Sequence, residues 1–103
     1  MGCGPAGAAT ALFLARAAPE LRERLLLIDK ATFPREKICA GGIGARADRL
    51  LDSIGVKVEV PAATVHGLSV KARCSWLVER LPCPIGRVVR RAEFDAALLD
   101  EVR

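Results

Sequence analysis

The sequence predicts an α/β fold in which a helix leads into a buried strand. Three observations predict it: the glycine-spaced opening MGCGPAG, an almost uncharged run over residues 6–18, and the apolar run LLLI before Asp29. A helix that is small or apolar on most sides is expected to pack beneath a sheet. A short continuous apolar segment such as residues 25–29 is typical of a buried parallel strand. Together they form the second half of a β-α-β unit.

Two prolines set the limits of the first helix. Pro5 fits the first turn, where its missing N–H is no loss, and Pro19 ends the helix. Residues 30–42 are expected to be a loop, because they contain a proline, two glycines and mixed charge. An amphipathic helix is expected over residues 43–54, capped by Gly55. Its predicted inner face consists of Ile43, Ala47, Leu50, Leu51 and Ile54.

The second half of the chain is expected to be extended until a final helix. Residues 56–60 alternate as an edge strand does, and residues 64–72 and 76–81 are expected to pair as a small β-meander. A short extended piece is expected over residues 86–90. The last helix, over residues 92–103, is predicted to bury Phe94, Ala97, Leu98 and Val102.

Composition excludes several classes of protein. The chain has 103 residues, enough for one domain at most, and 51% hydrophobic residues indicate a globular interior rather than disorder. The net charge of +4 is scattered and the chain has no Tyr, so it lacks the basic stripe or stacking platform of a nucleic-acid binder. The apolar stretch 5–15 is too short to span a membrane and does not follow the basic segment of a signal peptide.

The cysteines point to reduced thiols. Cys3, Cys39, Cys74 and Cys83 form no C-x-x-C pair, and one His cannot complete a common zinc site. A secreted disulfide scaffold would be smaller and richer in cysteine. We therefore expect a cytoplasmic protein with no metal site.

The opening glycines have the spacing G-x-G-x-x-G of a dinucleotide-binding loop. In that loop Gly2 allows a tight turn, Gly4 lets the backbone approach a pyrophosphate, and Gly7 allows close packing of the helix. The start of the helix, with Pro5 and Ala6, offers free N–H groups to the anion. The spacing alone is weak evidence, since any glycine-rich start could produce it.

An acidic residue strengthens this interpretation. Asp29 lies 22 residues after Gly7, at the tip of the expected strand. An acid at that point of a Rossmann-like fold hydrogen-bonds the ribose hydroxyls of the nucleotide. The alternative is that Asp29 merely ends a strand. Loop, helix, strand and acid together favour dinucleotide binding.

Three segments resemble a known family. GCGPAGAATALFLARAAP, LLLIDKATFPREKICAGGI and GRVVRRAEFDAALLDEVR are similar to the amino-terminal part of FAD-dependent oxidoreductases of the geranylgeranyl reductase family. This family belongs to the larger group of para-hydroxybenzoate-hydroxylase-like flavoproteins. The segment FPREKICAGGI is the most specific of the three. The resemblance implies a partial Rossmann-like FAD-binding domain over residues 1–103, with a small β-meander insertion.

The resemblance also implies a set of FAD-binding residues. The family's pyrophosphate loop matches Gly2, Gly4, Pro5, Ala6 and Gly7, and its ribose-binding acid with the next residue matches Asp29 and Lys30. Its two basic loop positions match Arg35 and Lys37, and its loop near the flavin matches Cys39, Ala40, Gly41 and Gly42. The Arg of its Arg-x-x-Phe-Asp motif matches Arg91. Without the family, Arg35 and Lys37 are more simply a solvated loop, Arg91 an exposed helix start, and Cys39 a small packed residue. We expect Cys39 to line the flavin pocket, and assign it no nucleophilic role.

The family pattern has parts that this chain lacks. The first strand before the glycine loop and the later flavin and substrate motifs are absent, so we expect a fragment that binds FAD weakly and is inactive alone. Catalytic residues stay unassigned. The parent enzyme is expected to reduce isoprenoid double bonds with hydride from FAD; a prenyl substrate would imply contact with a membrane surface. Alternatives are an FAD-dependent monooxygenase or halogenase of the same superfamily that uses NAD(P)H, a non-catalytic nucleotide-binding module, or a fragment that is either a non-functional relic or dependent on a partner.

Overall fold

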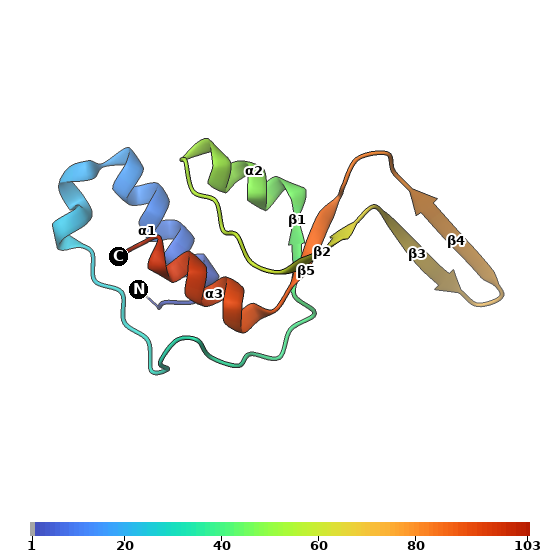
Figure 1. The fold of residues 1–103 in the computed structure, drawn as a ribbon, viewed down its shortest axis with the longest axis horizontal. Helices are drawn as coiled ribbons and strands as arrows, with labels where there is room; N and C mark the ends of the chain where they lie inside the picture. The colour runs from blue at the N-terminus through green and yellow to red at the C-terminus, as the bar shows by residue number, and fades with distance from the viewer. Residues whose placement is uncertain (1) are drawn as a thin grey trace.

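The computed structural model describes residues 2–103 and shows a mixed α/β chain. Three α-helices lie to one side of a small sheet, and a separate hairpin projects from its other side (Figure 1). In chain order the elements are α1 (Pro5–Ala17), the 3₁₀ helix η1 (Pro19–Arg24), β1 (Gly42–Gly44), α2 (Ala45–Ser53), β2 (Ala62–Val65), β3 (Gly67–Ala72), β4 (Ser75–Arg80), β5 (Gly86–Val89) and α3 (Arg91–Asp100).

Both sheets are antiparallel. The larger has the strand order β1-β5-β2, with Ile43 opposite Arg87 on one side and Thr64 opposite Arg87 on the other. The smaller is the β3–β4 hairpin, in which Val70 faces Leu77. The pairing of β3 with β4 confirms part of the predicted meander. The predicted strand over residues 64–72 is divided: residues 64 and 65 belong to β2, which pairs with β5, and the chain changes sheets at residue 66.

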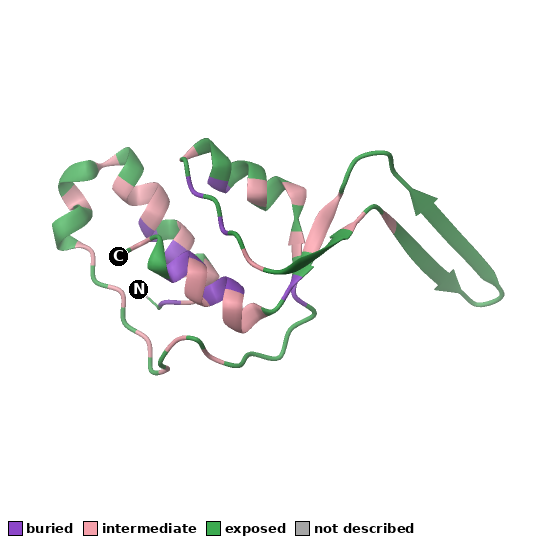
Figure 2. Ribbon diagram, in the orientation of Figure 1, coloured by how far each residue is buried: buried purple, intermediate pink, exposed green. Residues whose placement is uncertain are grey.

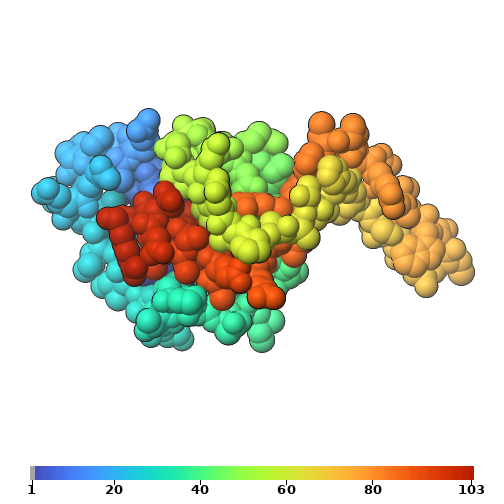
Figure 3. Space-filling view, in the orientation of Figure 1, coloured from blue at the N-terminus to red at the C-terminus, as the bar shows by residue number. Residues whose placement is uncertain are grey.

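The buried core lies between the helices and the larger sheet. Helices α1 and α3 pack against each other, and the buried side chains gather around them (Figure 2). The core cluster consists of Ala8, Leu51, Val56, Val58, Val89, Phe94 and Leu98. The hairpin contributes nothing to this cluster and stands away from the body as an arm (Figure 3).

Two predicted helices are confirmed and a third is shorter than predicted. Helix α1 begins at Pro5 and ends before Pro19. Helix α3 ends at Asp100 rather than at residue 103, and it buries Phe94 and Leu98 as expected, whereas Ala97 and Val102 are half-buried. The segment 43–54 instead begins as β1, because residues 42–44 pair with β5, and only residues 45–53 are helical. Of the predicted inner face Leu51 is buried, whereas Ala47 and Leu50 are exposed.

The predicted strands over residues 25–29 and 56–60 are wrong. Neither sheet of the described chain extends to residues 25–29, so this segment is irregular, and Ile28 is 65% exposed. Residues 56–60 also lie outside the sheets, although Val56 and Val58 are buried. Their alternation places the valines against the core without a strand ladder. The Val58 carbonyl accepts a side-chain hydrogen bond from Arg87 instead of a ladder hydrogen bond.

Candidate functional site

The glycine loop leads directly into the N-terminus of α1. Gly4 is the N-cap residue, and its carbonyl accepts the first helical hydrogen bond, from the Ala8 N–H at 2.9 Å. Gly4 has no side chain that could accept from the first turn, and Pro5 has no N–H. The N–H groups of Ala6 and Gly7 therefore form the open, electropositive end of the helix.

Gly7 is where the loop and the helix touch. A Cβ atom built at Gly7 would lie 1.7 Å from the carbonyl oxygen of Gly2. This is far inside van der Waals contact, so the backbone of the loop packs on α1 only because residue 7 lacks a side chain. Close packing of this kind is what the glycine spacing predicts for residue 7.

Asp29 lies against the same loop. Its Oδ2 accepts a hydrogen bond from the Cys3 backbone N–H at 3.2 Å, across 26 residues of sequence. Its Oδ1 accepts one from the Ala31 N–H at 3.1 Å. The N–H of Ala31, and then that of Cys3, hold the pKa of Asp29 below its ordinary value, because both stabilise the ionised form. The structure thus brings the predicted acid to the glycine loop even though its segment forms no strand.

Arg35 brings a cation to the loop. Its Nη2 lies 3.4 Å from the position that a Gly4 Cβ would take, and its guanidinium lies over the Phe33 ring, 5.0 Å from the centroid. Its Nε is buried and has no hydrogen-bond partner among residues 2–103. A buried donor without an acceptor is costly, so this nitrogen marks Arg35 as a group whose hydrogen bonding is incomplete within the described residues. The sequence did not single out Phe33, which supports the guanidinium.

Residues 39–41 form a second cluster with the end of β5. Gly41 has φ +75°, and a Cβ there would lie 2.1 Å from the Val89 carbonyl oxygen. The Val89 N–H donates to the Gly41 carbonyl at 3.0 Å. The Cys39 sulfur accepts from Nη1 of Arg91 at 3.2 Å and from the Gly41 N–H at 3.5 Å. These two donors, Gly41 first, lower the pKa of the Cys39 thiol.

Arg91 is held from behind by Asp95. Its Nε and Nη2 donate to the two oxygens of Asp95 at 2.7 Å and 2.9 Å. This hydrogen bonding raises the pKa of Arg91 further above its usual range. In front of Arg91 is a hollow of about 460 Å³, lined by Glu36, Lys37, Cys39, Val89, Arg90, Arg91, Ala92 and Glu93. The Arg91 and Asp95 spacing of four was visible in the sequence, but only the structure shows the pairing.

The predicted site residues thus fall into two groups. Gly2, Gly4, Gly7, Asp29 and Arg35 meet at the start of α1. Cys39, Gly41 and Arg91 meet at the start of α3, with Lys37 on the rim of the same hollow. Pro5 and Ala6 form the first turn of α1, beside the first group. The other three predicted residues, Lys30, Ala40 and Gly42, are exposed, and Gly42 is the first residue of β1.

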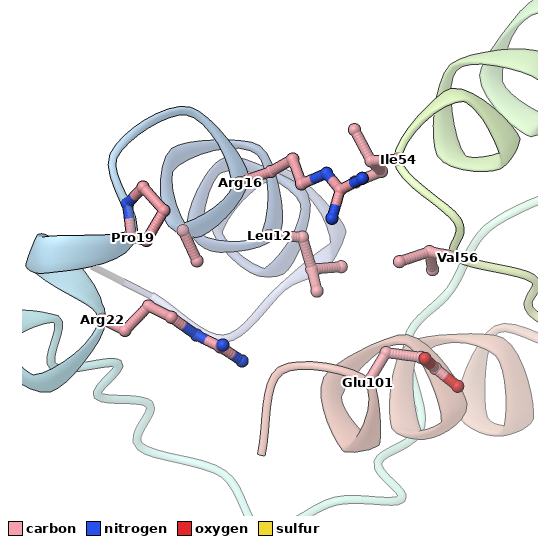
Figure 4. Close-up of a pocket in the computed structure, with 8 residues that line it drawn as sticks. Leu12, Arg16, Pro19, Arg22, Ile54, Val56 and Glu101 are labelled. Carbon is pink, nitrogen blue, oxygen red and sulfur yellow. The ribbon is translucent and has the colours of Figure 1, made fainter.

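Another hollow, of about 360 Å³, lies at the opposite end of α1 from the glycine loop. Leu12, Ile54 and Val56 form its apolar part (Figure 4). Arg16, Arg22 and Glu101 lie around it with charged groups that are exposed on the surface. Sequence reasoning assigned it no role, and its place excludes it from the glycine-loop site. Separately, no helix in residues 2–103 is both long and apolar enough for a membrane crossing.

Comparison with known proteins finds several relatives, and those with a named activity are menaquinone reductases. Menaquinone reductase from Mycobacterium tuberculosis is 45% identical over 101 residues, which is 92% of this chain and 24% of that protein. Menaquinone reductase from Mycolicibacterium smegmatis is 39% identical, with the same coverage. An uncharacterized protein from Methanosarcina barkeri is 44% identical over 52 residues, or 50% of this chain and 12% of that protein. No family profile and no solved structure matches. The chain spans about a quarter of the length of the menaquinone reductases that it matches.

Proposed function

We propose that this chain forms the adenine-nucleotide side of an FAD site in an FAD-dependent oxidoreductase of the geranylgeranyl reductase type. One observation carries the proposal: the carboxylate of Asp29 is hydrogen-bonded to the glycine loop at the start of α1, through the Cys3 N–H at 3.2 Å. The glycine loop, α1 and residues 25–29 would then be the nucleotide-binding part of a Rossmann-like unit. The name menaquinone reductase, shared by three of the relatives, supports an oxidation–reduction function.

The residues at the loop fit a diphosphate. The N–H groups of Ala6 and Gly7 at the helix end suit an anion, and Gly4 leaves its backbone uncovered. Arg35 adds a permanent positive charge beside Gly4, with a buried Nε that lacks an acceptor among the described residues. The guanidinium is the side chain best suited to phosphate oxygens. These groups would hold the diphosphate.

The acid beside the loop fits a ribose. Asp29 is partly exposed, and each of its oxygens accepts a hydrogen bond from a backbone N–H. An ionised carboxylate has about four acceptor sites, so capacity is left for hydroxyl donors. An ordinary aspartate is ionised at neutral pH, and the backbone donors lower the pKa of Asp29 further. Asp29 would hold the ribose hydroxyls.

The second cluster fits the flavin side of the same cofactor. Cys39 and Arg91 line the hollow at the start of α3, where Arg91 presents Nη1, and Gly41 donates its N–H to the Cys39 sulfur. Bound FAD would supply the hydride chemistry, whereas these residues would bind and orient it. The substrate class that we propose for the whole enzyme is an isoprenoid chain on a lipid or quinone, whose double bond is reduced. This substrate would require an encounter with a membrane surface.

A titration followed by NMR tests the nucleotide site. The ¹⁵N-labelled chain is titrated with ADP, FAD and FMN, which lacks the adenosine half. We expect ADP and FAD to shift the amides of residues 2–7 and of Ala31, and FMN to leave them unchanged. In Asp29→Asn the shifts should need a higher ligand concentration, whereas Asp52→Asn, an exposed change on α2, should behave as the parent chain.

Two outcomes of this titration would contradict the proposal. One is the absence of shifts at the glycine loop with millimolar ADP and FAD, and the other is an equal response of Asp29→Asn and Asp52→Asn. If FAD shifts no amides other than those that ADP shifts, the result would instead favour a non-catalytic nucleotide-binding module. The oxidoreductase part of the proposal is tested in a longer protein. In a chimera, this chain replaces the matching quarter of the M. tuberculosis relative. The chimeric protein should be yellow and carry FAD. Mass spectra of a prenyl substrate incubated with it should show the addition of two hydrogen atoms.

A further inference from the structure

We propose that Asp95 is a positioning residue, which locks the Arg91 guanidinium so that its Nη1 stays directed at the Cys39 sulfur in the hollow at the start of α3. This inference rests on the proposed function, because it makes Asp95 the support of the flavin-side arginine. The positioning itself needs no bound cofactor. It depends on three features: a two-point ion pair, the burial of its carboxylate, and the direction of the remaining nitrogen.

The ion pair is bidentate. Arg91 Nε lies 2.7 Å from Oδ1 of Asp95, and Nη2 lies 2.9 Å from Oδ2. Two parallel hydrogen bonds fix the plane of the guanidinium as well as its place. The two residues stand four positions apart on α3, a spacing at which helical side chains meet. The guanidinium is therefore held side-on, by one edge.

Burial makes this pair hard to open. The Asp95 side chain is 0% exposed and that of Arg91 is 15% exposed. Leu98 and Phe94 on the same helix are also buried. A carboxylate in such a place keeps its charge only if it is paired, so separating it from Arg91 would leave an uncompensated buried charge. The arginine cannot leave Asp95 as freely as a surface side chain could.

The edge that Asp95 leaves free is the one that faces the hollow. Nη1 of Arg91 lies 3.2 Å from the Cys39 sulfur, across 52 residues of sequence. The charged groups around that sulfur are Lys37 and Glu36 on its own loop, and Arg90, Arg91 and Glu93 at the start of α3. Of these, Arg91 is the side chain that donates a hydrogen bond to the sulfur. Asp95 thus acts on Cys39 through Arg91.

The adjacent arginine is a natural control. Arg90 is 85% exposed and lies 3.5 Å from Glu93, which is itself 39% exposed. Exposed pairs of this kind are worth little and hold no fixed geometry. Arg90 and Arg91 share a sequence context and differ in whether a buried carboxylate holds them.

The thiol of Cys39 reports the difference between positioning and simple charge. If Asp95 acted on Cys39 only by its negative charge, Asp95→Asn would lower the pKa of the thiol. If Asp95 positions Arg91, the same change frees the guanidinium, the Nη1 contact is lost, and the pKa of the thiol rises. The two roles therefore predict opposite signs.

The experiment measures alkylation of Cys39 by iodoacetamide against pH, in the full chain without nucleotide. Mass spectrometry of the Cys39 peptide separates it from Cys3, Cys74 and Cys83, which are also free. We expect Asp95→Asn to move the profile to higher pH and to slow the reaction at pH 7 by about threefold per pKa unit, since the loss of thiolate is partly offset by its greater nucleophilicity. Arg91→Lys should do the same, and Asp100→Asn, an exposed change on α3, should not.

A second measurement covers the case in which Asp95→Asn fails to fold. In the unaltered ¹⁵N-labelled chain, Arg91 should give a slowly exchanging Nε–H and separate Nη signals, while Arg90 gives averaged ones. Equal exchange at Arg90 and Arg91 would overturn the proposal, as would a thiol profile that moves to lower pH or stays in place in Asp95→Asn. Neither readout involves FAD, so failure here is distinct from failure of the nucleotide titration.

Discussion

The start of α1 and the β3–β4 hairpin are built on opposite principles. At α1, the loop is held by close tertiary contacts: Gly2 touches Gly7 on the helix, and Cys3 is hydrogen-bonded to Asp29, 26 residues further along the chain. In the hairpin, each strand pairs with its sequence neighbour, and residues 68–84 are all exposed (Figure 2). Trp76 is 65% exposed and lies under the Lys71 ammonium, 5.4 Å away. A two-stranded hairpin with no packed face is marginally stable in water.

This difference shows where the chain tolerates change. The body depends on close approaches that one added atom would disturb, whereas the hairpin depends on a local ladder. Four predictions test the contrast between the two regions, and their expected effects decrease in order.

The largest effect is expected in the core. Phe94 is 3% exposed, so Phe94→Ala should lower the free energy of unfolding by about 3–5 kcal/mol, through lost burial and the cavity left behind. Trp76→Ala removes a larger side chain from the hairpin but should cost about 0.5 kcal/mol, because its surroundings are open. Urea denaturation followed by circular dichroism measures both. Similar costs for the two variants would show that the hairpin is packed in solution.

The next effect is at the glycine loop. In Gly7→Ala the new methyl group would fall 1.7 Å from the Gly2 carbonyl oxygen, so the loop must move away from α1. The better helix propensity of Ala offsets only about 1 kcal/mol of this clash, so the free energy of unfolding should fall by about 1–2 kcal/mol, and the response of residues 2–7 to ADP should be lost. NMR titration and urea denaturation separate these outcomes. Gly44→Ala is the control, since nothing lies within 4 Å of the position that a Cβ would take there.

Part of this arrangement was predictable from sequence. The limits of α1 follow from Pro5 and Pro19, because proline acts locally. The meeting of Asp29 with the loop agrees with the spacing of the dinucleotide-binding motif, in which the acid lies close to the glycine loop. These are cases in which a short sequence pattern carries its own physical reason.

The failed predictions depended on distant partners. The apolar run before Asp29 is suited to a strand, but a strand needs a neighbouring ladder, and neither sheet of residues 2–103 provides one. On α2, hydrophobic periodicity placed Leu50 inside, whereas the charged pair of Asp48 and Arg87 fixes the side of the helix that faces β5. A hydrophobic pattern cannot show a salt bridge between residues 39 positions apart.

That salt bridge gives the third prediction. Arg87 donates Nε and Nη2 to Asp48, both at 2.9 Å, and Nη2 also to the Val58 carbonyl at 2.9 Å. Asp48→Asn should lower the free energy of unfolding by about 1 kcal/mol, because the pair is bidentate but partly exposed. Asp100→Asn, whose partner Arg103 is 72% exposed, should cost less than half as much. Equal effects in urea would mean that Asp48 does not anchor α2.

The smallest effect is a dependence on pH at the glycine loop. The pKa of Asp29 is lowered in the folded chain, by the Ala31 N–H first and also by the Cys3 N–H. Its contribution to stability is therefore present above the pKa of the unfolded chain and is lost as the pH falls through the lower, folded value. In the folded chain, the NMR shift of the Cys3 amide should change with pH as Asp29 titrates. The midpoint of this change should be lower than the midpoint of the Asp29 carboxyl in the urea-unfolded chain. The Trp76 amide is the control, because the hairpin has no contact with Asp29, and its shift should not follow this titration. If both amides changed with the same midpoint, acid would unfold the two regions together, and the Asp29 carboxylate would not hold the glycine loop by itself.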